Sequence, residues 1–220
     1  LGEAMDKGVV CSNYTDPKHT WDVVKNFKGG TALFTQPATP IKCGGAPQKI
    51  MYLAESHWAK NNIKSNAKVI FATAGSVIFG TKEIAKTLME VVDRKDINLR
   101  FNHKLVEVDG YNKIAWYELT KDVKAGGCVI MSGDDDGEYI DETFQYNYKD
   151  VKVTKKDGRY GIHYDMLHTA PPSVAPKFVK ESNLVNDAGW LDVDHHTMQH
   201  NKYSNIFGLG DVAALPTAKT

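Results

Sequence analysis

Cys43 is the residue of this sequence best placed for nucleophilic chemistry. It lies in the segment Thr39–Pro47, between an expected strand and an expected helix. A sulfur atom in front of a helix meets free backbone N–H groups and the positive end of the helix dipole, which favour the thiolate over the thiol. Lys42 adds positive charge, and Gly44-Gly45 leaves room for a substrate or a flat cofactor. The residues alone also allow a cysteine that only packs in a turn.

A second candidate is the turn Gly208-Leu209-Gly210-Asp211 near the end of the chain. A short β-like run leads into it, and Pro216 behind it indicates the start of a helix. In a strand-to-helix turn of this kind, backbone N–H groups and a carboxylate can hold the phosphates and hydroxyls of a nucleotide. Such turns also occur in α/β proteins without any ligand, so spacing alone leaves both interpretations open.

The segment 68–103 contains a strand, a helix and a second strand but lacks the motif of a dinucleotide site. Such a site needs G-x-G-x-x-G after the first strand and an acidic residue at the end of the second. Here the loop is Thr73–Gly80, and the second strand ends in Arg100–His103. We therefore expect a Rossmann-like unit that does not hold NAD(P)H.

Two clusters of metal-ligand residue types carry weaker signals. Aligning Gly137, which follows Asp134–Asp136, with the glycine of a calcium loop puts Thr143 where a bidentate Glu is needed. A solvated hairpin tip is the better interpretation of that run. Asp192–His196 has no second cluster at helical spacing to support it, so we expect an exposed turn there and no metal site.

Hydrophobic periodicity predicts the elements that position these residues. Apolar residues at helical spacing predict helices over Trp21–Phe27, Ile50–Trp58 and Ile84–Val92. On the second of these, the predicted buried face is Ile50, Leu53, Ala54, His57 and Trp58. Short apolar runs predict strands at Thr31–Thr35, Lys68–Thr73 and Asn98–Phe101.

The order of these elements predicts the fold class. Strand, helix and strand at this spacing imply right-handed crossovers and a parallel sheet, so we expect an α/β fold with a Rossmann-like sheet and flanking helices. The runs Leu105–Val108 and Ile114–Leu119 predict a hairpin at the edge or top of that sheet. Residues 121–161 are expected to form an antiparallel β excursion, which returns to the core at Tyr164–Leu167.

Composition excludes several classes of function. The 220 residues contain 27 Lys+Arg and 27 Asp+Glu, so no net charge recruits nucleic acid or an anionic membrane. No apolar run approaches the ~20 residues of a bilayer-spanning helix. Three cysteines do not make a disulfide framework. The chain opens at Leu1 and stops at Thr220 inside an expected helix start, so we expect an internal piece of a longer protein.

Several segments, in order along the chain, together resemble one known family. The longest is Thr39–Leu53, around Cys43. The others are Ser12-Asn13-Tyr14, Tyr164–His168 with Pro171-Pro172, Gly189–Asp194, and Asn205–Asp211 with Leu215–Thr220. This pattern resembles the sulfide:quinone oxidoreductases of the mitochondrial type, which belong to the FAD-dependent pyridine nucleotide-disulfide oxidoreductase superfamily. The stretch 121–161 lies outside the resemblance.

The resemblance implies a flavoprotein that oxidises sulfide at a cysteine pair and passes electrons through FAD to a membrane quinone. It implies sulfide, a sulfur acceptor and the quinone as partners, and a peripheral place on the bacterial cytoplasmic membrane or the mitochondrial inner membrane. Whether the protein is a homo-oligomer is left open. By position, Cys43 bears the persulfide, and Asp211 meets the ribityl or pyrophosphate side of FAD. The other implied FAD-binding residues are Pro172, Gly210, Val212 and Lys219, the last near the pyrimidine edge of the flavin.

One departure from the family pattern concerns the second redox cysteine. That cysteine often follows the Gly-Asp pair, and here the position holds Val212. Some relatives carry a cysteine upstream of the first one, and Cys11 stands 32 positions before Cys43. The resemblance therefore suggests Cys11 as the resolving thiol, and Cys128 as a structural or exposed thiol.

A second departure concerns the length of the chain. The resemblance implies that residues 1–30 and 164–220 belong to an FAD-binding domain and that 31–163 form a second Rossmann-like unit. The amino-terminal FAD fingerprint and the carboxy-terminal region are expected elsewhere, so this piece alone should bind FAD poorly and be inactive. Val212 also motivates an alternative, a non-catalytic flavoprotein relative that binds or transfers sulfane sulfur. A pyridine-nucleotide route to quinone is disfavoured by the missing fingerprint.

Overall fold

The largest sheet of the structure is parallel, as the buried β-type runs predicted. The computed structural model describes residues 8–39, 41–120, 128–130, 139–141 and 151–216. The sheet has the order β1-β11-β2-β3-β4, and every neighbouring pair is parallel. Its strands are β1 (Val10–Cys11), β2 (Gly30–Gln36), β3 (Ala67–Thr73), β4 (Ile97–Arg100) and β11 (Met166–Thr169). The predicted return of the chain to the core is confirmed, since β11 inserts between β1 and β2.

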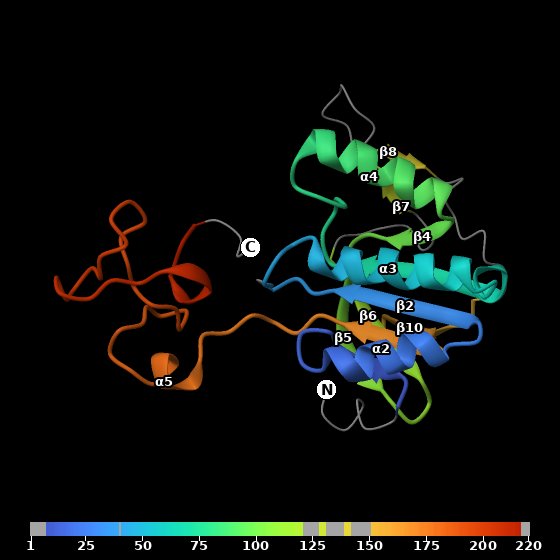
Figure 1. The fold of residues 1–220 in the computed structure, drawn as a ribbon, viewed down its shortest axis with the longest axis horizontal. Helices are drawn as coiled ribbons and strands as arrows, with labels where there is room; N and C mark the ends of the chain where they lie inside the picture. Colours follow the sequence, from blue (N-terminus) through green and yellow to red (C-terminus); the bar gives the residue numbers. More distant parts are fainter. Residues whose placement is uncertain (1–7, 40, 121–127, 131–138, 142–150, 217–220) are drawn as a thin grey trace. The chain divides into compact units, whose positions relative to one another are not determined.

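Helices cover one face of this sheet (Figure 1). They are α2 (Pro17–Asn26), α3 (Ala46–Lys60) and α4 (Lys82–Arg94), with a short 3-10 turn η1 (Lys64–Asn66) leading into β3. A buried cluster joins the helices to the sheet, with Val24 and Trp58 from the helices and Phe34 and Phe71 from the strands. The predicted helices and the parallel crossovers are therefore confirmed.

The buried face of α3 agrees with the prediction at Ala54 and Trp58, whereas Ile50 and His57 are only half-buried. Met51, Ala54 and Trp58 are buried, whereas Leu53 is 67% exposed. Leu53 was assigned to the buried face because it lies three residues after Ile50. In the structure, Met51 and Glu55 occupy the inward side of the helix instead. Trp21 on α2 is likewise about half exposed and packs edge-on against the ring of His57.

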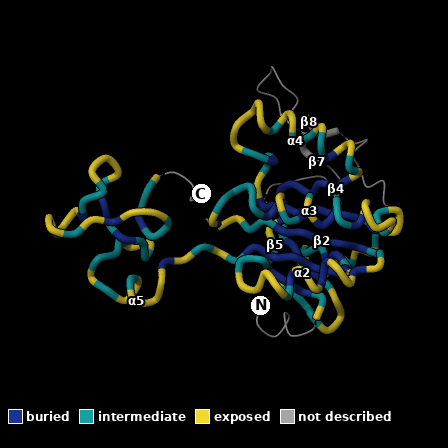
Figure 2. Tube along the Cα trace, in the orientation of Figure 1, coloured by how far each residue is buried: buried dark blue, intermediate teal, exposed yellow. Residues whose placement is uncertain are grey.

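A second, antiparallel sheet covers the other face. Its order is β5-β6-β10-β9, with strands β5 (His103–Asp109), β6 (Ile114–Leu119), β9 (Val153–Lys156) and β10 (Arg159–His163). The hairpin predicted at the edge or top of the parallel sheet is thus present, and it lies on the face of that sheet as part of a separate one. Side chains that alternate with those of the helical face fill the space between the sheets, among them Leu33, Ile70, Tyr117 and Ile162. Figure 2 shows the buried backbone concentrated in the central strands.

Part of the antiparallel excursion is described. β7 (Cys128–Ile130) pairs with β8 (Tyr139–Asp141) in a two-stranded antiparallel ladder. The candidate calcium run at 134–136, Thr143 and Lys219 lie outside the described residues.

The chain divides into two compact units. Unit 1 comprises residues 1–38 and 47–171 and contains both large sheets. Unit 2 comprises residues 39–46 and 172–220, with the short helix α5 (Lys177–Lys180) and the 3-10 turn η3 (Gly210–Val212). Its core is small and centres on Leu191, Val193 and Ala213. The assignment of 1–30 and 164–220 to an FAD-binding domain stays a prediction.

Candidate functional site around Cys43 and Asp211

Cys43 lies on a tight turn of unit 2 that leads into α3. Its carbonyl accepts a hydrogen bond from the backbone N–H of Ala46 at 2.9 Å, and its side chain is partly exposed. The backbone of Cys43 has φ 57°, in the left-handed region. This conformation costs a non-glycine residue about 1–3 kcal/mol and is most often found at Asn and Asp. The turn therefore holds a cysteine in a strained conformation although glycines follow at 44 and 45.

An ion pair joins the Cys43 turn to the Gly-Asp turn within unit 2. Lys42 Nζ lies 2.5 Å from Asp211 Oδ2, and both side chains are largely solvent-accessible. The hydrogen bond and charge of Asp211 raise the pKa of Lys42, and the charge of Cys43 contributes in the same direction. The ammonium group of Lys42 therefore stands within electrostatic reach of both predicted site residues. The two segments that the sequence marked separately are brought together.

Gly208 and Gly210 of the Gly-Asp turn are glycines for different physical reasons. A Cβ on Gly208 would lie 2.2 Å from Leu191 Cδ2, so that glycine serves packing. Gly210 has φ +72°, and a Cβ there would meet no heavy atom within 4 Å. Gly210 thus lets the chain turn on an open surface and begins η3, whose first turn carries the carboxylate of Asp211. Exposed backbone and a carboxylate at such a turn are groups that can hold hydroxyls and phosphates.

Cys11 lies in a very different environment. It is fully buried on β1 of unit 1, opposite His168 in the register with β11. Burial raises the pKa of its thiol to about 12, against a smaller opposing effect of a hydrogen bond with Thr20. Burial therefore favours the neutral thiol at Cys11 in this structure. Its role as the resolving thiol stays a prediction.

The remaining predicted site residues are distributed as follows. Val212 lies in η3 and packs against the small core of unit 2, and Pro172 is exposed at the start of that unit's second segment. Cys128 begins β7, where it pairs with Asp141. The roles assigned to these residues by resemblance stay predictions.

Asp194 organises the loop that the sequence marked as a weak metal candidate. Its Oδ1 accepts hydrogen bonds from the backbone N–H groups of His196 and Thr197 and from the Thr197 hydroxyl. The bonds from Thr197, followed by that from His196, lower the pKa of Asp194. The carboxylate thus serves the turn. Within the described part of the chain, no three His, Cys, Asp or Glu side chains gather in a way that could hold a metal ion.

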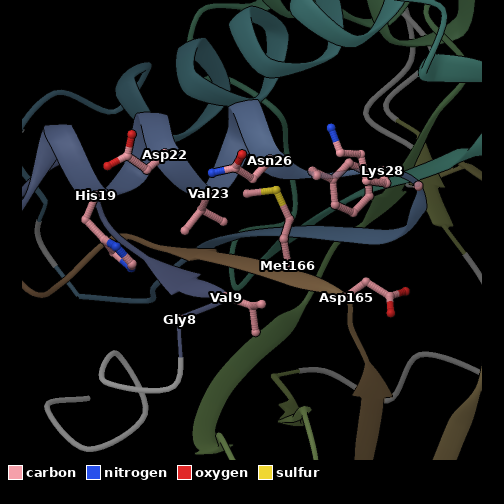
Figure 3. Close-up of a pocket in the computed structure, with 11 residues that line it drawn as sticks. Gly8, Val9, His19, Asp22, Val23, Asn26, Lys28, Asp165 and Met166 are labelled. Carbon is pink, nitrogen blue, oxygen red and sulfur yellow. The ribbon is translucent and has the colours of Figure 1, made fainter.

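A cavity of about 350 Å³ lies in unit 1 between α2 and the beginnings of β1 and β11 (Figure 3). Val9, Val23 and Met166 form apolar parts of its lining, and His19 and Asn26 contribute polar groups. His19 Nε2 is 3.1 Å from the carbonyl of Val10 and so serves the sheet edge. None of the described residues that line this cavity is a predicted site residue.

The sequence analysis missed a buried polar corner at the end of β4. Arg100 is 4% exposed, and nearby Tyr117 and Asn102 are buried as well. A signal was present, because an arginine between Leu99 and Phe101 interrupts an apolar strand. Arg100 was interpreted only as a sign that the acidic residue of a dinucleotide site is missing, and its burial was not predicted.

Comparison of folds defines the class of protein. Over 90% of this chain and 39% of the other, the structure superposes on the sulfide:quinone oxidoreductase of the bacterium Aquifex aeolicus with a TM-score of 0.62 at 15% sequence identity. A chain in the mitochondrial ATP synthase structure of Tetrahymena thermophila gives a TM-score of 0.53 at 25% identity, covering 90% of this chain and 40% of that one. The α/β architecture is thus shared with these solved chains, which confirms the predicted fold class.

Sequence comparison identifies the particular relatives. The whole chain aligns with the mitochondrial sulfide:quinone oxidoreductases of Mus musculus at 39% identity, Dictyostelium discoideum at 35% and Schizosaccharomyces pombe at 30%. The chain is a homologue of the sulfide:quinone oxidoreductases. It spans 42% of the length of each of these curated relatives. No family model matches the chain.

The described helices are short relative to the thickness of a bilayer. The longest, α3, has 15 residues, and none of the helices in the described ranges combines the length and hydropathy that crossing a bilayer requires.

Proposed function

We propose that the protein to which this chain belongs oxidises sulfide at Cys43 and delivers the electrons, through FAD, to a membrane quinone. Alignment of the full chain with mitochondrial sulfide:quinone oxidoreductases supports the reaction class. The observation that carries the assignment to residues is the Lys42–Asp211 ion pair, which sets the Cys43 turn beside the Gly-Asp turn. Sulfide, a sulfur acceptor and a quinone are then its small-molecule partners. The protein acts at the surface of the membrane that holds the quinone.

The donor set of the Gly-Asp turn fits FAD. The open surface at Gly210 admits a close approach of phosphate, and the Asp211 carboxylate can accept hydrogen bonds from ribityl hydroxyls. Lys42 supplies a positive charge beside these groups. When bound, FAD supplies a two-electron acceptor for the sulfur chemistry and a donor for the quinone. Gly210 and Asp211, with Pro172, Val212 and Lys219, are the residues that we assign to it.

The chemistry of the chain's own residues centres on sulfur exchange. Hydrosulfide attacks a disulfide that includes Cys43, the S–S bond breaks, and a new S–S bond forms on Cys43 as a persulfide. The second sulfur of the original disulfide leaves as a thiolate and keeps the electron pair of the broken bond. Lys42 supplies a positive charge within electrostatic reach of the Cys43 sulfur. Cys11 is the residue we assign to the second sulfur.

A substitution in the full-length protein tests this proposal. Cys43→Ser removes the sulfur but keeps the size of the side chain, so sulfide-dependent quinone reduction should fall to background. Tm and flavin content should stay at the wild-type level, because Cys43 is partly exposed and outside the core. Cys128→Ser is the matched control. Quinone reduction at the wild-type rate in the Cys43→Ser protein contradicts the proposal.

A second candidate function is sulfane-sulfur binding or transfer without electron flow to quinone. Val212, which packs against the core of unit 2, favours it because valine cannot take part in disulfide exchange. Sulfide-dependent bleaching of the flavin band separates the candidates. The oxidoreductase bleaches on mixing with sulfide, and a pure binder retains its oxidised spectrum.

A further inference from the structure

Helices α2 and α3 lie side by side in unit 1 and share an outer surface. Trp58 Nε1 of α3 donates a hydrogen bond to the carbonyl of Val24 on α2 at 2.9 Å, which holds the two helices together. Nearer the solvent, the indole of Trp21 packs edge-on against the ring of His57, with the ring centroids 4.9 Å apart. The outward sides of the two helices therefore form one continuous surface, on the side away from the parallel sheet.

The outward side of each helix carries one large apolar side chain between two lysines. Trp21 on α2 is 49% exposed, and Leu53 on α3 is 67% exposed. The lysines stand three residues before and four after Trp21, and four residues before and seven after Leu53. Residues at these spacings lie on the same side of a helix, so each pair of lysines flanks its apolar side chain. We call this set the lysine face; it consists of Lys18, Trp21, Lys25, Lys49, Leu53 and Lys60.

The lysine face is positive although the chain as a whole has no net charge. All four of its lysines are exposed, and none forms an ion pair with a described residue. Glu55, the one acidic residue within α3, is buried on the inward side of that helix and pairs with Lys95. Asp22 is the one acidic residue within α2. Four exposed ammonium groups are therefore offset by a single exposed carboxylate on these two helices.

We propose that the lysine face docks on a lipid bilayer with anionic headgroups. Trp and Lys suit the interface of a bilayer, because the indole and the lysine stem reach the acyl boundary while the ammonium group stays among the headgroups. The negative potential of such a surface attracts each lysine near it, and the attraction adds up over several lysines. Charges spread along two helices around two separate apolar side chains match a plane of headgroups better than they match one acidic segment of a protein. This inference rests on the proposed function for the presence of a membrane, but it involves neither Cys43 nor the Gly-Asp turn.

Lysine acetylation of the full-length protein tests the contact directly. An acetyl N-hydroxysuccinimide ester labels exposed amines, and mass spectrometry gives the labelled fraction at each lysine. Vesicles of phosphatidylcholine with about one third phosphatidylglycerol should slow labelling of the four lysines of the lysine face at least about three-fold, whereas phosphatidylcholine alone should not. Lys152 and Lys156 are exposed beside and on β9 of the antiparallel sheet, so they are the internal controls and should be labelled equally throughout. Unchanged labelling of the lysine face with anionic vesicles overturns the proposal, even where the protein sediments with them.

Paired substitutions measure how much the lysine face adds to membrane binding. Lys18→Gln with Lys60→Gln removes two exposed charges, so the partition coefficient of the full-length protein onto anionic vesicles should fall about ten-fold or more. Lys152→Gln with Lys156→Gln makes the same change of net charge on the antiparallel sheet and should keep the wild-type value. Equal partition coefficients in the two double variants overturn the proposal.

Two further measurements separate this proposal from its alternatives. Poly-glutamate in place of vesicles stands for an acidic protein; protection of the lysine face by poly-glutamate and not by anionic vesicles overturns the proposal in favour of such a partner. Reduction of a water-soluble quinone by sulfide, without any vesicle, should proceed at the wild-type rate in both double variants. A wild-type protein that docks through the lysine face but does not oxidise sulfide would contradict the proposed function alone.

Discussion

Lys42 Nζ and Asp211 Oδ2 lie 2.5 Å apart although their residues are separated by 169 positions in the chain. The pair links the two turns of unit 2 that carry the predicted nucleophile and the predicted nucleotide contacts. It is solvent-accessible, so its effect on folding is small. Its consequence is positional and electrostatic, because it fixes an ammonium group next to the backbone of Cys43.

Replacing Lys42 by Met should slow alkylation of Cys43 with little change in Tm. The hydrogen bond and charge of Asp211 are the main causes of the raised pKa of Lys42, and the Cys43 sulfur also lies within electrostatic reach of the ammonium group. Without this positive charge, attack by the Cys43 sulfur loses electrostatic assistance, so the second-order rate with iodoacetamide should fall several-fold. Lys49→Met, an exposed lysine of the neighbouring helix, is the control and should react at the wild-type rate. Equal rates in the Lys42→Met and wild-type proteins would refute an electrostatic role.

Cys11 should resist modification in the folded protein. With a pKa raised to about 12 by burial, only roughly one thiol in ten thousand is ionised at pH 8. Mass spectrometry after brief iodoacetamide treatment at pH 8 should find Cys43 labelled and Cys11 unlabelled, and both labelled in denaturant. Rapid labelling of Cys11 in the folded protein would contradict this prediction and would mean that β1 opens readily.

Stability should decrease as the pH falls from about 6.5 to about 4. Burial lowers the pKa values of His168 and His103 to about 4, against 6.5 in the unfolded chain. In that window the unfolded chain binds protons that the folded protein does not. The free energy of unfolding therefore decreases as the pH is lowered through the window and reaches its full value above about pH 6.5. Each ring accounts for at most about 3 kcal/mol.

The measurement is urea unfolding at pH 7, 5 and 4, followed by tryptophan fluorescence. His168→Gln should reduce the loss of stability between pH 7 and pH 4 by roughly half, since His103 remains. His195→Gln, in an exposed loop of unit 2, controls for the loss of a histidine. A pH dependence that is the same in the His168→Gln and wild-type proteins would show that this ring is protonated in the folded state.

Lys95→Met should destabilise unit 1 strongly. Lys95 follows α4 and pairs with Glu55, whose side chain is 5% exposed on α3. Removing one partner leaves a buried carboxylate uncompensated, which costs about 3–5 kcal/mol, whereas Glu55→Gln combined with Lys95→Met should recover much of that loss. Lys104→Met breaks an exposed pair with Glu118 at 4.0 Å and should change stability little. Urea unfolding of the wild type, Glu55→Gln, Lys95→Met and the double variant measures the coupling, with Lys104→Met as the control; additive effects of the two single changes would contradict the buried pairing.

Local sequence was sufficient for the elements whose burial is set by their own periodicity. The runs that became β2 and β3 are almost continuously apolar, and α4 carries its apolar residues on one stripe, so strand and helix could be distinguished. The face of α3 was less certain, because Met51 and Leu53 are equally apolar and contacts with distant strands decide which one is buried. The short strand β1 was not predicted, because two residues are too few to show a hydrophobic periodicity.

What the sequence determined by itself is the α/β class and the chemistry available at Cys43 and at the Gly210-Asp211 turn, because residue type and short-range spacing encode both. What only the tertiary structure decided is which of these groups meet and which are kept from solvent. Lys42 pairs with Asp211, Cys11 is buried beside His168, and Arg100 is enclosed between two sheets. Each of these results depends on segments far apart in the chain being brought together, and the free energy of desolvation at such places cannot be obtained from local sequence.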